Sequence, residues 1–199
     1  MHYSSKLIER AVEEIAKLPG IGKKSALRIV LHLLKQDPKQ SHQLAEALIQ
    51  LRDNIQYCRE CHNIADEALC YFCKDTRRRR DIICVVEHFK DIAAIERTGH
   101  YHGLYHVLGG LISPIDGVGP QDIHIESLLQ RVRQGEVTEV ILALSSTMEG
   151  DTTAFYLTKR LKEQQVKVTA LARGVPIGSE LEFTDELTLT RSLLGRTEF

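Results

Sequence analysis

The sequence has 199 residues, 43% of them hydrophobic, and a formal net charge of −1. This length and hydrophobic content suffice for one ordinary globular domain or for two to three small ones. No run approaches the roughly 18 to 20 apolar residues of a membrane-spanning helix, and the charged N-terminus lacks the apolar stretch of a signal peptide. We therefore expect a cytoplasmic protein without membrane contact.

The charge is distributed unevenly along the chain. Residues 1 to 80 hold 15 Lys and Arg against 10 Asp and Glu, a net charge of +5, whereas residues 81 to 199 have a net charge of −6. A positive excess favours contact with the phosphates of nucleic acid. A DNA-binding surface is therefore expected in the N-terminal part.

The first 55 residues have helical periodicity. Ser4 and Ser5 can cap a first helix, whose apolar residues recur at three- and four-residue spacing until a Pro-Gly pair ends it. A second periodic stretch follows at residues 26–34, and Ser41 can cap a third helix. The chain is thus expected to begin with a helical hairpin domain over residues 1–55.

The turn between the first two helices, in the segment LPGIGKKSA, has a glycine spacing that suits phosphate binding. The backbone amides of Gly20, Gly22 and Lys23 can point at one phosphate, because glycine lets the backbone approach closely. Lys24 and Arg28 are four residues apart on one helical face and can contact the same strand. The segment resembles the helix-hairpin-helix motif of DNA-binding proteins that ignore base sequence. The alternative is an ordinary helical hairpin with solvated lysines.

Four cysteines form two C-x-x-C pairs, Cys58 with Cys61 and Cys70 with Cys73. Each pair can present two thiolates to one tetrahedral Zn²⁺, and a segment as short as residues 56–76 cannot fold without such a ligand. Because four cysteines leave no open position for catalysis, we expect one structural zinc per chain. The alternatives are two redox pairs or four free thiols.

From residue 77 the pattern alternates between strands and helices, which implies a parallel sheet with helices on both faces. The expected strands are 82–86, 104–108, 140–144 and 166–171, and the expected helices lie near 89–97, 123–132 and 152–162. The first strand is a continuous apolar run, so both of its faces should be buried, with Cys84 as a core residue. The fold class is therefore α/β, built from several parts.

Two further groups of polar residues, an arginine run and three histidines, do not by themselves indicate a functional site. Arg77 to Arg80 form a basic run that can follow DNA phosphates or can be a solvated linker. His100, His102 and His106 complete no recognised metal-ligand spacing with nearby carboxylates. Structural or surface roles are expected for these histidines.

Three acidic residues are expected at the carboxyl ends of strands. Glu87 follows the first strand, and Glu149 and Asp151 follow a later strand across a Glu-Gly-Asp turn. Ligand sites of parallel sheets lie at this edge, so the three carboxylates can converge and bind Mg²⁺. The alternative is three solvated loop acids, two of which stabilise the N-terminus of the next helix.

The segment VVE at residues 85–87, with the Glu-Gly-Asp turn, resembles the Toprim domain of topoisomerases and primases, whose acids are a Glu and an Asp-x-Asp. Here the second element reads Glu149-Gly150-Asp151, which weighs against catalysis. The order of hairpin, C-x-x-C pairs, Toprim-like sheet and the tail LARGVPIGSELEFTDELTLTRSLLGR is similar to that of the RecR family of bacterial recombination mediators. The segment YHGLYHVLGGLISPIDGVGP is similar to the family's signature between the first two Toprim strands.

The resemblance implies a protein without catalytic activity that holds single- and double-stranded DNA regardless of sequence. It implies self-association into a ring, usually a tetramer, and cooperation with RecO and RecF to load RecA at gapped DNA. It places DNA contact at Lys24 and Arg28, and partner contact or metal-dependent behaviour on the Toprim face with Glu87. The tail segment GVPIGSELEFTDE resembles a Walker-B-like element of subunit contacts, but no G-x-x-x-x-G-K-[ST] loop accompanies it, so ATP hydrolysis is not supported.

Two other functions stay open at this point. A small Mg²⁺-dependent nuclease or primase can be built on the Toprim acids, and a zinc-stabilised scaffold can use the hairpin to bind protein. The expected domains are 1–55 for the hairpin, 56–76 for the zinc finger, 77–172 for the Toprim domain and 173–199 for a C-terminal segment ending in a short helix.

Overall fold

The computed structural model describes residues 5–196 and divides into two compact units, Met1–Ile55 and Gln56–Phe199. Of the two expected N-terminal caps, Ser4 lies outside the described residues. No helix in the described part combines the length and apolar content needed to cross a membrane. The further division of the second unit at residues 76 and 172 stays a prediction.

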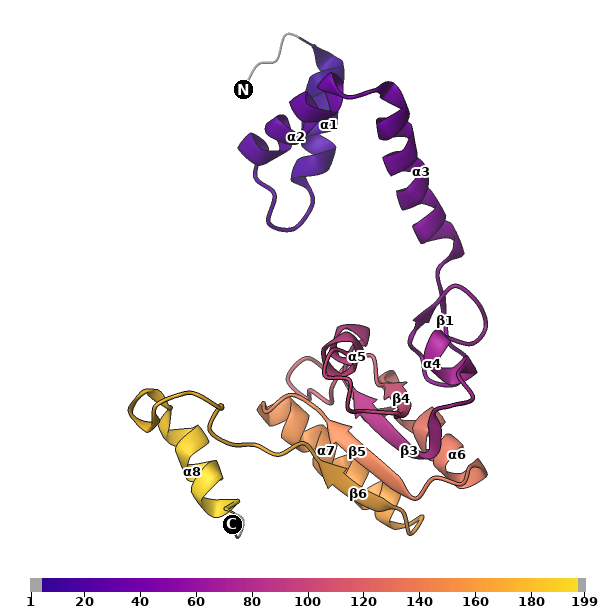
Figure 1. Cartoon of the computed structure of the whole chain (residues 1–199), viewed down its shortest axis with the longest axis vertical. Helices are drawn as coiled ribbons and strands as arrows, with labels where there is room; N and C mark the ends of the chain where they lie inside the picture. Colours follow the sequence, from indigo (N-terminus) through magenta and orange to yellow (C-terminus); the bar gives the residue numbers. More distant parts are fainter. Residues whose placement is uncertain (1–4, 197–199) are drawn as a thin grey trace. The chain divides into compact units, whose positions relative to one another are not determined.

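The first unit is helical, as expected, and consists of α1 (Lys6–Ala16), α2 (Lys23–Lys35) and α3 (Pro38–Asn54) (Figure 1). Ser5 caps α1, because its side chain accepts a hydrogen bond from the Leu7 amide. The helices α1 and α2 pack around a small core of Val12, Ala26 and Val30. Hydrophobic burial between these two helices therefore holds the hairpin together.

The third helix begins three residues before Ser41, so the cap expected at that serine is wrong. Asp37 is the N-cap and accepts a hydrogen bond from the Lys39 amide at 2.8 Å. Pro38 occupies the first helical turn, where its fixed φ angle suits a helix start. An Asp-Pro pair is therefore a stronger start signal than the later serine.

The second unit begins with a small cysteine-containing segment. Its strands β1 (Gln56–Tyr57) and β2 (Ile64–Ala65) pair antiparallel, and the short helix α4 (Tyr71–Lys74) follows. The next element is a four-stranded sheet of order β4-β3-β5-β6, in which all neighbours are parallel. Its strands are β3 (Arg79–Val86), β4 (Gly103–Val107), β5 (Glu139–Ala143) and β6 (Lys167–Ala170).

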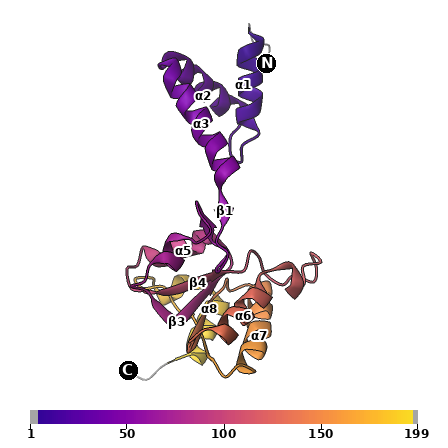
Figure 2. The same cartoon turned by 90° about the vertical axis from the view of Figure 1, so that its right-hand side faces the viewer.

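Helices cover both faces of this sheet, which confirms the expected α/β architecture (Figure 2). Ile83 and Val85 of β3 face the core beneath α6 (Ile125–Gln134) and α7 (Met148–Lys162). Cys84 and Val86 face the opposite core, which includes Ile92 of α5 (Phe89–Glu96). Successive side chains of a strand point to opposite faces, so an unbroken apolar run fits a strand buried on both sides. Cys84 is a core residue, as expected.

The helix α7 begins at Met148, four residues before its expected start, so Glu149 to Asp151 form its first turn rather than a separate loop. The Thr147 side chain caps this helix by accepting a hydrogen bond from the Gly150 amide at 3.1 Å. A Cβ atom at Gly150 would lie 2.0 Å from the Ser145 carbonyl oxygen. Only glycine therefore allows the helix to start so close to the end of β5.

Short helical elements complete the second unit. The 3₁₀ turn η1 (Pro120–Asp122) precedes α6, and the C-terminal segment contains the 3₁₀ turn η2 (Leu181–Phe183) and the helix α8 (Glu186–Leu194). Asp185 caps α8 by accepting a hydrogen bond from the Thr188 amide. The short terminal helix predicted from the sequence is thus present.

Candidate functional site

The glycine turn between α1 and α2 leaves backbone amides uncovered. Gly20 has φ +76°, a left-handed conformation that favours glycine, whereas Gly22 has an ordinary φ of −83°. A Cβ at Gly22 would meet nothing within 4 Å, so packing does not require glycine there. Gly22 is also the N-cap of α2 and supplies no side-chain cap. The first amides of α2 are therefore open to an external anion.

Basic side chains surround this turn. Lys23, Lys24 and Arg28 are exposed, and none of them forms an ion pair within residues 5–196. A shallow groove along α2 is lined by Lys24 and Arg28 and continues past His32 to Lys35. These last two residues were not predicted from the sequence, although their spacing of four and seven from Arg28 continues the same helical face. The turn and the groove together form one basic surface, which we name the hairpin surface.

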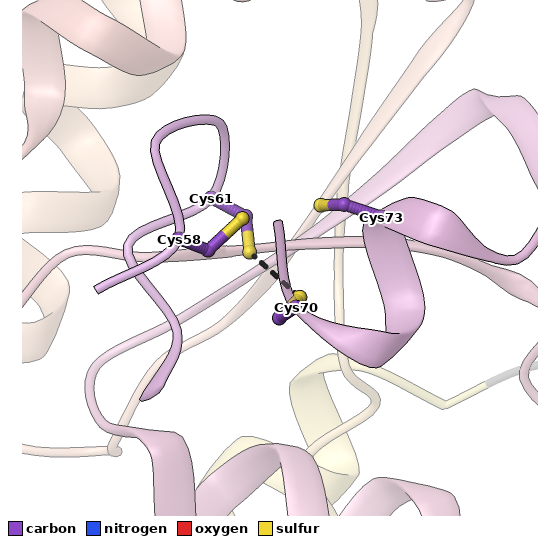
Figure 3. A group of neighbouring side chains, drawn as sticks. All are labelled: Cys58, Cys61, Cys70 and Cys73. Atoms are coloured by element: carbon purple, nitrogen blue, oxygen red, sulfur yellow. Dashed lines mark hydrogen bonds between the residues drawn. The ribbon is translucent and has the colours of Figure 1, made fainter. Parts of the chain in front are cut away.

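The four cysteines form a single buried cluster. Cys58 and Cys61 come from the turn after β1, and Cys70 and Cys73 come from the start of α4, with their sulfur atoms gathered in one place (Figure 3). All four Sγ atoms lie within 4.8 Å of one another, and each residue is at most 2% exposed. A tetrahedral zinc with Zn–S bonds of about 2.3 Å needs sulfurs about 3.8 Å apart. The geometry therefore fits one structural zinc held by four cysteines.

The electrostatics of the cluster also favour a cation. Hydrogen bonds from the Cys61 and Cys73 thiols lower the pKa of Cys70, while the hydrogen bonds to Cys70 and Cys73, with burial, raise the pKa of Cys61. Four thiolates this close repel one another unless a cation lies between them. Two separate redox pairs do not match the arrangement, because the Cys61 and Cys70 sulfurs, from different pairs, are 3.5 Å apart.

The segment from β1 to α4, residues 56–74, which we name the zinc segment, is attached firmly to the sheet. The Val107 amide of β4 donates to the Cys61 carbonyl at 2.8 Å. Arg131 of α6 donates to the Tyr105 carbonyl at 2.6 Å, and its second terminal nitrogen lies 4.0 Å from the Cys73 sulfur. The Phe72 ring packs edge-on against Tyr105. The zinc segment and the sheet are therefore one structural body.

The basic run divides into paired and unpaired arginines. Arg77 pairs with Asp75 at 2.9 Å, Arg78 with Glu96 at 2.6 Å and Arg79 with Asp81 at 2.6 Å; these pairs account for three of the four arginines. Arg80 forms only a 3.4 Å hydrogen bond to the Cys73 carbonyl within the described residues. Most of the run is thus committed to intramolecular contacts.

The three histidines near residues 100 to 106 have the structural and surface positions expected of them. His100 and His102 are exposed, whereas His106 is buried and its Nε2 lies 2.8 Å from the His124 carbonyl oxygen. Burial lowers the pKa of His106 to about 3. His106 is therefore a neutral core residue at physiological pH.

The carboxyl edge of the sheet contains an acidic cleft, and the structure brings two of the three expected acids to it. Glu87 and Glu149 line this cleft together with Asp116 and Asp122. The last two were not predicted from the sequence, although their loop also leaves the sheet at the carboxyl end of a strand, β4. Within residues 5–196, the cysteine cluster is the only group of three or more ligand atoms close enough to share one ion.

Asp151 has a different role from the other two acids. Its carboxylate accepts hydrogen bonds from Arg173 at 2.6 Å and from Arg191 of α8 at 3.1 Å. The hydrogen bond from Arg173 and the charges of both arginines lower the pKa of Asp151. This residue therefore ties the C-terminal segment to the start of α7.

Comparisons with known proteins give a consistent result along the chain. Family models match in order: the RecR helix-hairpin-helix at residues 8–52, the four-cysteine zinc finger domain of RecR at 55–75, the Toprim domain at 81–172 and the RecR C-terminal model at 174–197. The recombination protein RecR of Amoebophilus asiaticus is 58% identical over 196 residues, which cover 98% of both chains. The RecR proteins of Flavobacterium johnsoniae and Phocaeicola vulgatus are 54% and 55% identical, over 100% and 99% of this chain and 97% and 96% of the relatives.

Proposed function

The chain belongs to the RecR family of recombination proteins, and from this premise we propose that it is a mediator that holds DNA and helps RecO and RecF to load RecA at gaps. One observation carries the proposal: the hairpin surface combines open amides at the start of α2, after Gly22, with exposed Lys24 and Arg28, which form no ion pair within residues 5–196. Phosphates are the natural ligand of such a surface. We further propose that the protein acts in the cytoplasm.

The proposed DNA contact ignores base sequence. Amides and ammonium or guanidinium groups recognise phosphate oxygens, which are the same at every nucleotide. The turn around Gly20 and Gly22 presents no Asn or Gln, the usual readers of adenine. The hairpin surface is therefore expected to bind single- and double-stranded DNA alike.

We propose that several copies of the chain form a clamp that holds DNA, which requires contacts between the copies. The helix α3 has no buried residue among those described, and its Leu44, Leu48 and Leu51 are 49%, 58% and 59% exposed. In the C-terminal segment, Ile177 and Phe183 are also largely exposed. Soluble monomers rarely expose so many large apolar side chains, so the exposed side chains of each unit support self-association, which we propose to be tetrameric.

We propose that the Toprim acids contact a partner such as RecO, or a Mg²⁺ ion, without turnover. Glu87 and Glu149 face the acidic cleft, where a cation or a basic partner would offset the charges of the four acids. Asp151, the final acid of the Toprim pattern, is engaged by two arginines and would have to leave them to bind a metal. A nuclease or primase therefore lacks a complete set of carboxylates.

The test of DNA binding uses the full-length protein with Lys24 and Arg28 both changed to Ala. Fluorescence anisotropy with labelled single-stranded and duplex DNA, repeated over a salt series, measures the affinity and its salt dependence. The variant is expected to bind all sequences more weakly, with a salt slope smaller by about 0.9 for each duplex phosphate that it no longer binds.

A matched control removes two other positive charges of the first unit, Lys17 and Arg52, by the same change to Ala. Lys17 pairs with Glu14 on α1, and Arg52 lies in the last turn of α3. The control is expected to bind DNA nearly as the wild type does. Equal affinity of the wild type and of the Lys24 and Arg28 variant would favour the scaffold function, in which the hairpin binds protein.

A further inference from the structure

A second cleft of the Gln56–Phe199 unit lies where the zinc segment meets the sheet. It measures about 520 Å³ and is lined by Arg59 of the zinc segment, Arg80 of β3 and Arg131 of α6, among others. We name it the arginine cleft. It shares no lining residue with the acidic cleft at the carboxyl edge of the sheet.

The three guanidinium groups of the arginine cleft retain unused donors. The Arg59 side chain forms no hydrogen bond or ion pair within residues 5–196, and Arg80 has only its 3.4 Å bond to the Cys73 carbonyl. Arg131 is held in place by the Tyr105 carbonyl and the Cys73 sulfur. Since a guanidinium has five N–H groups, each arginine can still donate to a ligand.

Arg80 differs from the other members of its basic run. Arg77, Arg78 and Arg79 each pair with a carboxylate at 2.9 Å or less, and Arg78 is 10% exposed in its side chain. The acids Asp75, Asp81 and Glu96 thus offset the charges of those three arginines. Arg80 keeps its charge available, and it is the member of the run that lines the cleft.

The cleft also contains two acids, Glu60 and Glu136, so its lining has a net charge of +1. Neither acid forms an ion pair with the three arginines in the part of the chain that the structure describes. Gln130 and Gln134 add neutral hydrogen-bond donors from α6. A ligand with one negative charge and several acceptor oxygens matches this lining best.

We propose that the arginine cleft binds a phosphodiester of the DNA backbone, as a second DNA contact beside the hairpin surface. The inference rests on the proposed DNA-binding function. A phosphodiester carries one charge and presents two free oxygens, which guanidinium groups contact in a paired geometry. Arg59 belongs to the zinc segment, and Arg131 contacts the Cys73 sulfur of that segment. A zinc ion bound there would therefore help to fix the positions of both arginines.

The experiment compares two double variants of the full-length protein in which the same amount of charge is removed. Arg59→Ala with Arg80→Ala removes two arginines of the cleft, and Arg77→Ala with Arg79→Ala removes two acid-paired arginines of the same region. Anisotropy with labelled single-stranded and duplex DNA is expected to show a several-fold higher Kd for the cleft variant alone. Its salt slope should fall by about 0.9 for each duplex phosphate that it no longer binds.

Several outcomes would overturn the proposal. Equal weakening by both double variants would mean a long-range charge effect, and no weakening by the cleft variant would remove the cleft from DNA binding. Unchanged DNA affinity together with weaker binding of an acidic peptide would identify a protein ligand instead. Zinc content and thermal melting are measured on both variants. If the cleft variant loses zinc, Arg80→Ala is tested alone, and its unchanged affinity would equally contradict the proposal.

The two DNA contacts fail separately. If Lys24→Ala with Arg28→Ala leaves DNA affinity unchanged, the proposed DNA contact of the hairpin surface is wrong, whatever the result for the cleft variant. If that variant weakens binding and the cleft variant does not, the proposed function holds and only the further inference fails.

Discussion

The hairpin surface and the zinc segment carry their functional residues in opposite ways. In the hairpin, the functional residues Gly20, Gly22, Lys23, Lys24 and Arg28 lie within nine consecutive residues and are all exposed. In the zinc segment, the cysteines are buried and their environment includes Arg131 of α6 and Val107 of β4. A change in the first region should therefore alter binding, whereas a change in the second should alter folding.

The largest effect is expected for Cys70→Ser, which removes one of the four proposed zinc ligands. Metal binding supplies much of the folding free energy of such small segments, on the order of 10 kcal/mol in isolated zinc-finger peptides. The variant should lose zinc, by elemental analysis, and the second unit should melt at a much lower temperature. Cys84→Ala, in the sheet core, is the control and should retain one zinc per chain. Wild-type protein purified without chelator and found free of zinc would refute the structural zinc.

A smaller loss of stability is expected for Gly150→Ala, in the first turn of α7. The added Cβ would overlap the Ser145 carbonyl oxygen, and relieving that overlap should cost about 2 kcal/mol or more. Urea unfolding measures this cost. A variant as stable as the wild type would show that α7 can start later than Met148 without penalty.

In the hairpin, Gly22→Ser should separate binding from folding. Serine is a better N-cap than glycine, and its side chain has free space at this position, so stability should stay equal or rise by a few tenths of a kcal/mol. The serine oxygen would accept a hydrogen bond from an amide of α2 that is otherwise open to phosphate, so DNA affinity should fall. Thermal melting tests the expected stability, and anisotropy on the same preparation tests the expected loss of DNA affinity. Unchanged affinity would contradict the amide contact.

Only small changes in stability are expected at the acids of the Toprim domain. Asp151→Ala breaks the pairs with Arg173 and Arg191, but the carboxylate is 41% exposed and such pairs contribute about 0 to 1 kcal/mol. Glu87→Ala should leave folding unchanged. Both variants should keep DNA binding by the hairpin while impairing assembly with RecO, which a pull-down with purified RecO measures.

The enzyme alternative is tested with the same variants. Wild-type protein is incubated with single-stranded, nicked and duplex DNA and with Mg²⁺ or Mn²⁺, beside the Asp151→Ala protein. We expect no cleavage and no synthesis, because Asp151 does not line the acidic cleft and is held by Arg173 and Arg191 instead. Activity that is present in the wild type and absent from the variant would replace the mediator by a nuclease or primase.

The sequence by itself determined the features that act over short distances along the chain. The two C-x-x-C pairs predict one four-cysteine cluster, the Pro-Gly-Ile-Gly turn predicts a break between two helices, and the apolar run at residues 82–86 predicts a strand buried on both faces. In each case neighbouring residues are enough, because the local spacing sets which side chains point the same way.

Only the tertiary structure decided the fate of the charged residues. Asp151 is drawn to Arg173 and Arg191, Asp116 and Asp122 join Glu87 at the acidic cleft, and Arg80 alone of its run stays without an acid among the described residues. The partners of these groups come from distant parts of the sequence. Opposite charges attract over several ångströms in any direction, so the partners of Asp151 depend on where the folded backbone passes, whereas Arg77 and Arg79 pair with acids only two residues away.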